Sequence, residues 1–353
     1  MVKKIKTQGD RAILANIARN RFSIDGKGLK IGIISDSFNA LGGAKKDIRK
    51  GELPGGTNPD GFTRPVRVLR DFPQGSDEGR ALAQILFDVA PGSELLFHTV
   101  GEDEQDFASA IQALTNAGAD VIIDDILLAT SPFFQDGVAA QAVDRAVNQG
   151  VVYVTAAGNN GNRAYSSSFR SGASFTFRGT TYEAHDFDAG EGVDLFQAIQ
   201  IPANAEIDLL LNWDEAAGAV NTDLDVFLLD RPMLPGAGGE VLDDGTLLIQ
   251  NEDSPAKRVQ YDATDSKTVY LLIAHNTAST GAAPNQIQWI SFANTIDGNT
   301  IYEYVNDTPG ATGASTVFGH QNAAGAIAVG AVAYKQTPKF GSKSPKLESF
   351  SSR

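Results

Sequence analysis

Four groups of acidic or amide residues stand where apolar stretches of the sequence end or begin: Asp36, Glu78, the pair Asp124–Asp125, and Asn159. A carboxylate can accept or donate a proton as a general base or acid, and a side-chain amide can donate a hydrogen bond to a developing negative charge. In a parallel α/β sheet, ligands and reacting groups collect beyond the carboxyl ends of the strands. What these residues can do therefore depends on whether their surroundings form such a sheet.

Residues 28–160 alternate between short apolar runs and amphipathic stretches. The apolar runs suit buried parallel strands and lie at residues 29–35, 94–100, 119–124 and 151–158. Apolar residues recur at helical spacing in residues 78–89, 107–118 and 138–147. This order predicts an α/β domain in which helices cover both faces of a parallel sheet. Within residues 78–89 we expect one buried stripe made of Ala81, Leu82, Ile85, Leu86 and Val89.

The pattern changes after about residue 162. Short strand-like runs now alternate with Gly, Asp, Asn and Pro, and several have period two, as in Ile287, Trp289 and Ser291. This pattern is typical of a β-sandwich. The stretch Ala323–Tyr334 returns to the texture of a buried strand. We therefore predict one α/β domain, formed by residues 1–162 and 313–353, that is interrupted by a β-sandwich insertion at residues 163–312. Two sequential domains are the alternative.

The composition limits the classes of partner. The 353 residues carry 29 basic and 43 acidic side chains, a formal charge of −14, which disfavours nucleic acid as a partner. There is no cysteine, which excludes disulfides, thiol catalysis and Cys-based zinc sites. No run approaches the roughly 18 apolar residues that cross a bilayer. The start "MVKKIKTQGD" shows no apolar run of the kind a signal peptide needs.

Each candidate also has a purely structural explanation. An aspartate after a strand can cap a turn, and the sequence around Asn159, "GNNG", forms turns readily. Glu78 in the first turn of a helix gains about 0.3–1 kcal/mol from the helix dipole. The acids also permit a receiver-like domain that binds Mg²⁺, although no lysine or threonine is placed at a later strand end to complete that site.

Five segments in order resemble the subtilisin-like serine peptidases, a superfamily that includes subtilases and sedolisins. They read "IGIISDSF", "DEGRALAQILFDVAPGSEL", "GADVIIDDIL", "VVYVTAAGNNG", and "AIAVGAVAY" with "ESFSSR". The resemblance implies a subtilisin-like parallel sheet and cleavage of peptide bonds in a polypeptide substrate. It places Asp36 as the acid of the catalytic triad and Asn159 as the donor to the oxyanion. It places Glu78 where subtilisins have histidine.

The nucleophile is a second departure from the subtilisin pattern. The segment "GTS-x-A", which carries the catalytic serine in the family, does not occur in the sequence. Ser349, Ser351 and Ser352 belong to the stretch that precedes that segment. We therefore expect the serine in a C-terminal remainder beyond residue 353, and we expect the present chain to be inactive alone.

The glutamate is similar to the base of the sedolisins, which act in acid. Two close carboxyls resist ionising together and titrate as a pair, which raises the pKa of one of them. We expect Asp36 and Glu78 to share a proton in this way, with an acidic optimum for the intact protein. Sedolisins carry a further acid one turn along the helix, where this chain has Leu82. Asp125 is a candidate for that missing carboxyl in the substrate cleft, whereas Arg80 could instead neutralise an acid there.

The segment "LNWDEAAGAVNTDLDVFLLD" resembles the β-sandwich modules attached to secreted bacterial peptidases. We expect Val226 and Leu228 to face its core. Asp214, Asp223 and Asp225 are weak candidates for a calcium site, and the proposed reaction requires no cofactor. The resemblance favours export from the cell, which no visible signal peptide supports.

Two functions remain open from the sequence. The first is a serine-type endopeptidase that uses Asp36, Glu78 and Asn159. The second is a pseudopeptidase that binds peptides or serves a structural role, which the absence of the histidine and the presence of Leu82 favour.

Overall fold

The computed structural model describes residues 7–247, 254–292, 300–305 and 314–353. These residues divide into two compact units. The first unit takes in the described residues of Met1–Ser131, Asp136–Gly158 and Gly319–Ser351, and the second those of Pro132–Gln135, Asn159–Phe318 and Ser352–Arg353. Each unit has its own sheets and its own core.

The first unit is built on a six-stranded sheet in the order β18-β5-β4-β1-β3-β2, in which every neighbouring pair is parallel. The strands are β1 (Lys30–Ser35), β2 (Arg67–Arg70), β3 (Glu94–Thr99), β4 (Val121–Asp124), β5 (Val152–Ala156) and β18 (Ala326–Val329). The α-helices are α1 (Gln8–Ala12), α2 (Ala15–Phe22), α3 (Ala44–Lys50), α4 (Glu78–Val89), α5 (Glu104–Asn116) and α6 (Val138–Asn148). Short 3₁₀ helices are η1 (Gly319–Asn322), η2 (Tyr334–Gln336) and η3 (Pro338–Phe340).

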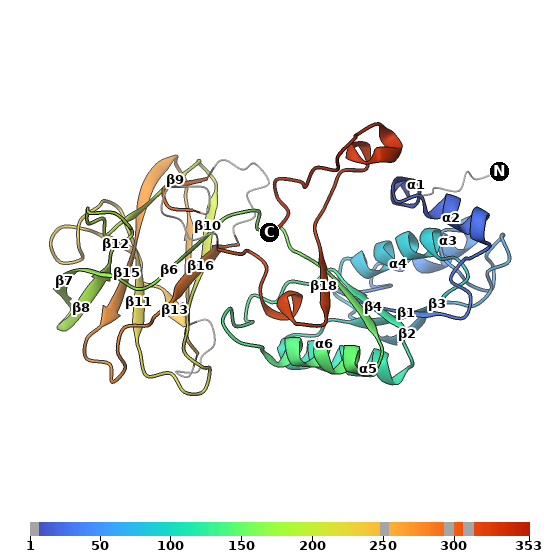
Figure 1. Cartoon of the computed structure of the whole chain (residues 1–353), viewed down its shortest axis with the longest axis horizontal. Coiled ribbons are helices and arrows are strands. Elements are labelled where there is room, and N and C mark those ends of the chain that lie inside the picture. The colour runs from blue at the N-terminus through green and yellow to red at the C-terminus, as the bar shows by residue number, and fades with distance from the viewer. Residues whose placement is uncertain (1–6, 248–253, 293–299, 306–313) are drawn as a thin grey trace. The chain divides into compact units, whose positions relative to one another are not determined.

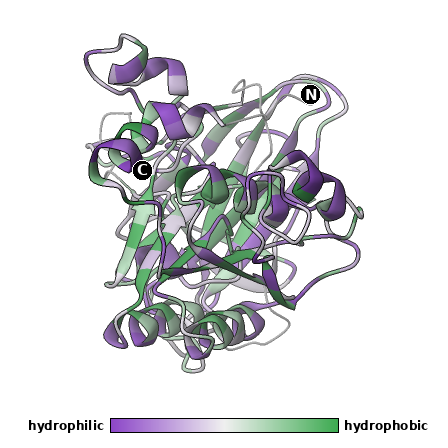
Figure 2. Ribbon diagram, turned by 90° about the vertical axis from the view of Figure 1, so that its right-hand side faces the viewer, coloured by the Kyte–Doolittle hydropathy of each residue, from purple (hydrophilic) through white to green (hydrophobic). Residues whose placement is uncertain are grey.

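Helices cover both faces of this sheet, as the sequence predicts. Figure 1 shows α4 on one face and α5 and α6 on the other. Because side chains alternate along a strand, Ile33 and Phe97 pack under α4, with Ala83 and Phe87 of that helix in the same cluster. Ile34 faces the other way, into the cluster that α5 and α6 form. The strands are mostly green in Figure 2 and several helices carry both colours, as amphipathic helices do.

The predicted buried stripe of α4 is only partly right, since Leu82 and Leu86 pack against the cluster beneath the helix. The buried positions of the helix are Gly79, Ala83, Phe87 and Asp88, whereas Ala81 and Ile85 are exposed. The reason is Gly79, whose missing side chain lets the helix start lie against the Ser37 carbonyl and the Ser35 side chain. That close approach sets which side of the helix faces the sheet.

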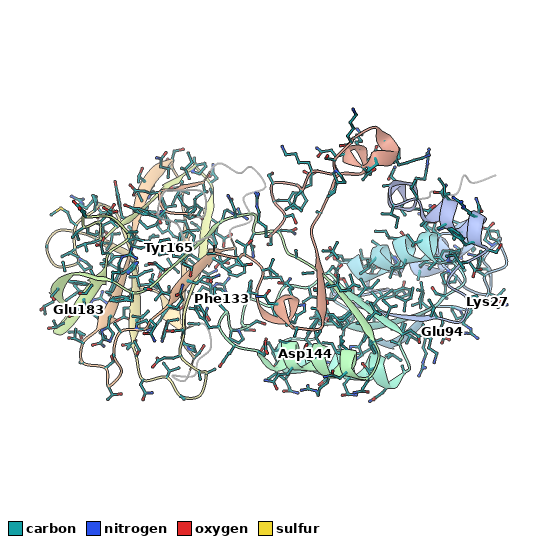
Figure 3. The ribbon with its side chains drawn as sticks, in the orientation of Figure 1. Lys27, Glu94, Phe133, Asp144, Tyr165 and Glu183 are labelled. Carbon is teal, nitrogen blue, oxygen red and sulfur yellow. The ribbon has the colours of Figure 1, made fainter. Side chains whose placement is uncertain are left out.

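The stretch 323–334 forms a strand, but its predicted burial is also wrong. Strand β18 lies at the edge of the sheet, and Ile327 and Val329 are each about half exposed. Figure 3 labels Asp144 on α6, whose carboxylate accepts a hydrogen bond from the Gly325 backbone at 2.8 Å. That bond holds the turn before β18 against α6.

The second unit consists of antiparallel strands. Its described strands are β6 (Ala164–Ser167), β7 (Ser171–Phe177), β8 (Thr180–His185), β9 (Gln197–Ile201), β10 (Glu206–Trp213), β11 (Leu224–Leu229), β12 (Val241–Asp243), β13 (Thr246–Leu247), β14 (Ala256–Asp262), β15 (Lys267–Asn276), β16 (Ile287–Ser291) and β17 (Ile301–Tyr302). One sheet has the order β13-β14-β10-β16-β6. The other contains β12-β11-β15-β8-β7, and β9 and β17 extend it from β15.

Large apolar side chains from both antiparallel sheets form the core of the second unit. Trp213, Trp289, Val226 and Leu228 belong to it, and the last two face inward as the sequence predicts. Tyr165, labelled in Figure 3, lies with its ring 5.2 Å from that of Phe187 and stacks on Trp289. The fold class is therefore confirmed as α/β with a parallel six-stranded sheet flanked by helices, together with antiparallel sheets.

No helix in the described part of the chain has the length and apolar character needed to cross a membrane.

Candidate functional site

Three of the predicted site residues belong to one edge of the parallel sheet. Asp36 directly follows β1, and Asp125 directly follows β4, which pairs with β1. Glu78 is the first residue of α4, whose start lies against the end of β1 at Ser35 and Ser37. Strand alternation places Asp125 on the same face as Ile123 and Ser35, which is the face that α4 covers. The structure thus gathers three carboxylates at the carboxyl end of the sheet.

Asp36 acts as an acceptor for the start of α4. Its carboxylate accepts hydrogen bonds from the backbone N–H groups of Ser37, Ser76 and Glu78, the last at 3.0 Å. The Ser76 hydroxyl donates to it at 2.7 Å. Burial raises the pKa of Asp36, but the Ser76 hydroxyl and these backbone donors outweigh it and hold the pKa below its ordinary value. Asp36 therefore favours its charged form.

Two glycines permit this arrangement. A Cβ at Gly75 would collide with the Ser37 side chain and lie 3.0 Å from the Asp36 carboxylate. A Cβ at Gly79 would collide with the Phe97 ring and come within 2.8 Å of the Ser37 carbonyl. The sequence "SDEG" therefore brings the helix start within hydrogen-bond distance of Asp36 because no side chain separates them.

Glu78 meets Asp36 through its backbone, since the bond at 3.0 Å joins the Glu78 N–H to the Asp36 carboxylate. The Glu78 residue is exposed. Arg80, which the sequence offered as a neutralising charge, instead pairs with Asp77 at 2.8 Å and with Asp47 at 3.2 Å. The described residues provide no ion pair to Glu78.

Asp125 has the most perturbed carboxyl of the site. Burial is the main cause that raises its pKa to about 6; the negative charges of Glu78 and Asp124 contribute to the rise, and the nearby Ser35 hydroxyl opposes it. Its Oδ1 atom is buried and has no hydrogen-bond partner among the described residues. The carboxyl that feels the charge of Glu78 is thus Asp125, the residue the sequence named for the cleft.

Asp124, the neighbour of Asp125, points to the opposite face and is fully buried. Its carboxylate accepts a hydrogen bond from Thr155 at 2.8 Å and lies 3.2 Å from Nε2 of His320. The His320 ring packs 4.6 Å from that of Phe107 on α5. These contacts fix the end of β4, and alternation then directs Asp125 toward Glu78.

Asn159 begins the longest segment of the second unit. Its side chain is exposed, and its backbone carbonyl accepts a hydrogen bond from Arg163 at 3.1 Å. Its role toward an oxyanion stays a prediction.

The three aspartates considered for calcium are not gathered around one position. The Lys257 ammonium lies 3.3 Å from Asp223 and 3.1 Å from Asp225, so a protein cation already neutralises both. Asp214 uses its backbone N–H to bond the Gln286 carbonyl at 3.1 Å. In the described ranges no group of three or more His, Asp or Glu side chains could hold a metal ion.

The serines near the chain end serve the local backbone. Ser351 and Ser352 are buried, and their hydroxyls accept hydrogen bonds from the N–H groups of Ala331 and Asn160 at 3.1 and 3.0 Å. That neither is the nucleophile stays a prediction.

Sequence reasoning missed three residues that shape the site: Asp71, Asp77 and His320. Asp77 has a left-handed backbone with φ of 65° and a buried carboxylate, directly before Glu78. The Asp71 carboxylate accepts hydrogen bonds from the N–H groups of Phe38 and Asn39, which lie more than 30 positions earlier in the sequence. Asp77 stands in the acid-rich stretch "SDEG", which is a local signal. Asp71 and His320 are too far in sequence from the residues they bond for a local pattern to reveal the pairing.

No family model and no curated protein matches this sequence. Among solved structures, the chain is similar to the CspB protease of Clostridium perfringens, with 12% identity, a TM-score of 0.48, and coverage of 98% of this chain and 75% of that one. It is also similar to the prenylagaramide maturation protease PagA, with 16% identity and a TM-score of 0.29, over 41% of this chain and 51% of that one. A lanthipeptide protease matches with 17% identity and a TM-score of 0.31, over 43% and 45% of the two chains. Because TM-scores and identities this low carry no argument about residues or activity, we argue the chemistry from the site alone.

Proposed function

We propose that this protein is a serine-type endopeptidase of the subtilisin-like superfamily whose general base is Glu78. The observation that supports this best is the acid pair Glu78 and Asp125 at the carboxyl edge of a parallel sheet. No described cation neutralises either acid, and the pKa of Asp125 is raised to about 6. Carboxyls brought together without a counter charge are costly to fold, so they point to a reaction that uses a shared proton.

In this proposal the attacking group is a serine. Its hydroxyl oxygen forms a bond to the peptide carbonyl carbon while its proton passes to the Glu78 carboxylate. Glu78 then returns the proton to the amide nitrogen as the carbon–nitrogen bond breaks. Water hydrolyses the acyl-enzyme by the same route. Asp36 holds the start of α4 in place, and Asn159 donates to the oxyanion.

The proposed role of Asp125 is to carry the shared proton. In its protonated form it can donate a hydrogen bond within the site, next to Glu78. Above about pH 6 that proton is lost and two adjacent anions remain, which repel one another. We therefore expect an acidic optimum, with peptidase activity that falls as the pH rises through about 6.

The test uses the product of the whole gene, including any residues encoded after Arg353. Peptide hydrolysis should fall by about 10²–10⁴ in Glu78→Gln, the contribution expected of a positioned proton-transfer group. Glu102→Gln, which changes an exposed acid elsewhere in the same unit, is the matched control and should leave the rate unchanged. Equal rates for Glu78→Gln and wild type, or an optimum above pH 8, would contradict the assignment.

A pseudopeptidase that binds peptides is the second candidate. One observation favours it: the Asp36 carboxylate accepts hydrogen bonds from Ser37, from Ser76 and from Glu78 at the start of α4, so that acid has a structural task whether or not a reaction occurs. Binding of a peptide by the whole gene product, without turnover at any pH from 3 to 9, would decide for this function.

A further inference from the structure

Two large apolar side chains are exposed on loops that lie near Asp36 and Glu78 in the sequence. Leu41 is 70% exposed and Phe72 is 43% exposed. Neither belongs to any of the hydrophobic clusters formed by the described residues. Single exposed apolar residues are ordinary on protein surfaces, so the case for these two depends on what holds them.

Leu41 and Phe72 lie on two loops that we call the acid-bridged loops, residues 36–43 and 71–77. The first contains Asp36, and the second ends directly before Glu78. The Asp71 carboxylate joins the loops: it accepts hydrogen bonds from the N–H groups of Phe38 at 2.8 Å and Phe72 at 2.9 Å through the same oxygen. Its other oxygen accepts from Asn39 at 3.0 Å.

A second carboxylate fixes the tip of the first loop. Asp77 accepts a hydrogen bond from the Leu41 N–H at 3.2 Å and pairs with Arg80 of α4 at 2.8 Å. Asp77 is buried in a left-handed backbone conformation, which a non-glycine residue adopts only when its surroundings hold it there. Below them, Phe38 packs against the Phe97 ring at 5.6 Å. Carboxylates thus hold the backbone of both loops, while the two side chains lie outside the hydrophobic clusters of the described residues.

Leu41 is five positions after Asp36 in the sequence, and Phe72 is six positions before Glu78. Phe38 and Phe72 share one Asp71 oxygen, and Leu41 is three positions from Phe38. Carboxylates already hold the backbone of these loops. Leucine and phenylalanine side chains that stay in water add nothing to the stability of the fold. A ligand that covers them would gain apolar contact at a place already ordered, with little loss of conformational freedom.

We propose that Leu41 and Phe72 form a specificity-determining wall that binds a large apolar side chain of a peptide substrate beside the bond served by Glu78. That the bound peptide is a substrate rests on the proposed function. The wall would bind the same peptides even if the protein did not cleave them. The occupant is an extended peptide with leucine, phenylalanine or a similar residue. A small or charged residue at that position would leave both side chains in water.

The first experiment measures binding to the 353-residue chain itself. Fluorescein-labelled peptides of one sequence, with Leu, Phe, Ser or Asp at a single scanned position, are titrated and followed by anisotropy. The wild-type chain should prefer the Leu and Phe peptides. The double variant Leu41→Ser/Phe72→Ser should lose about tenfold or more in affinity for them, the scale of discrimination by an apolar pocket, and should bind the Ser peptide as wild type does.

The matched control is Leu29→Ser/Phe22→Ser. It removes the same two residue types, 45% and 64% exposed, from the same unit. Leu29 precedes β1 at the opposite end of that strand from Asp36. The control should keep the wild-type preference. Equal losses in both double variants, no preference of the wild type for apolar peptides, or no binding of any peptide would each overturn the proposal.

A second measurement separates this inference from the proposed function. Cleavage of the same peptide set by the whole gene product gives kcat/KM for each residue. If Leu41→Ser/Phe72→Ser cleaves all peptides with the wild-type profile, the wall is refuted while the peptidase stands. If the binding preference depends on Leu41 and Phe72 but no peptide is ever cleaved, the wall stands and the peptidase fails.

Discussion

The two units treat their acidic residues in opposite ways. In the antiparallel unit, Asp208 receives both a 2.7 Å and a 2.6 Å hydrogen bond from the Arg258 guanidinium. Lys257 in turn lies between Asp223 and Asp225. In the parallel unit, Glu78 and Asp125 have no described cation, and the cation nearest in sequence, Arg80, binds Asp77 and Asp47 instead.

This difference separates acids that stabilise a fold from acids available for chemistry. A cation close to a carboxylate lowers the pKa of that carboxyl and keeps it charged. A second carboxylate close by, without a cation, raises the pKa instead. The raised pKa of Asp125 is thus a cost to the parallel unit that a purely structural acid would not impose. The sequence has acids in both units, and only their partners distinguish them.

The largest effect should come from breaking a pair in the antiparallel unit. Arg258→Ala leaves the largely buried Asp208 without its partner, which we expect to lower the free energy of unfolding by about 3 kcal/mol. Both tryptophans of the chain, Trp213 and Trp289, lie in the core of this unit. Tryptophan fluorescence during guanidinium unfolding therefore reports on this unit by itself. Replacing both partners, as Arg258→Met with Asp208→Leu, should recover most of the loss; no recovery would mean that Arg258 acts through packing.

At the candidate site we expect a substitution to raise the free energy of unfolding instead of lowering it. Asp125→Asn removes a carboxyl whose pKa in the folded state is about 6, above the ordinary value of 3.8. Such a group binds its proton more tightly in the folded than in the unfolded state, so stability falls as the pH rises from about 4 through about 6. At pH 7 the variant should gain at most about 3 kcal/mol, and at pH 3.5 it should gain almost nothing.

Native-state hydrogen exchange of the β1 and β4 amides measures this gain in the parallel unit alone. Asp136→Asn, an exposed acid of the same unit, serves as the control and should change neither value. Equal protection of wild type and Asp125→Asn at pH 7 would show that the carboxyl carries no folding cost. In that case the contrast between the two units would be lost.

A smaller loss of stability should follow when a side chain is added next to the Asp36 carboxylate. Gly75→Ala places a Cβ against the Ser37 side chain and the Asp36 carboxylate, and overpacking of this kind costs about 1–2 kcal/mol. The loop should shift and weaken the Ser76 hydrogen bonds, so the pKa of Asp36 should rise toward its ordinary value. Carboxyl carbon chemical shifts against pH measure this. Gly56→Ala, with no atom within 4 Å of the new Cβ, should leave both quantities unchanged.

How much of this follows from the sequence depends on how far apart the partners lie along the chain. Period-two and helical patterns are local, so the strands and α4, which begins at Glu78 as predicted, could be located from the sequence. The buried side of α4 could not, because Gly79 and its contact with the end of β1 decide it, and Ala81 and Ile85 are as apolar as the residues that are buried.

The site shows the same division. Asp36, Glu78 and Asp125 were all named from their places at strand and helix ends, since parallel strands bring such ends to one edge. The sequence did not show which of these carboxylates lie close enough to repel one another, because that depends on the directions of their side chains. Strand alternation directs Asp125 toward α4, whereas the carboxylate of Asp36 is occupied by backbone donors. His320 and Asp124 lie 196 residues apart in sequence and left no local trace.

The smallest effect tests whether ion pairing as such, or its burial, separates the two units. Asp244 pairs with Arg178 at 3.0 Å, but both side chains are more than half exposed. Water screens such pairs, so Asp244→Ala should change the free energy of unfolding of the antiparallel unit by less than about 0.5 kcal/mol. The same tryptophan signal measures it. A loss as large as that of Arg258→Ala would mean that every paired acid stabilises this unit to the same degree; a loss near zero leaves burial as the reason why Asp208 needs Arg258, and why an unpaired Asp125 is costly.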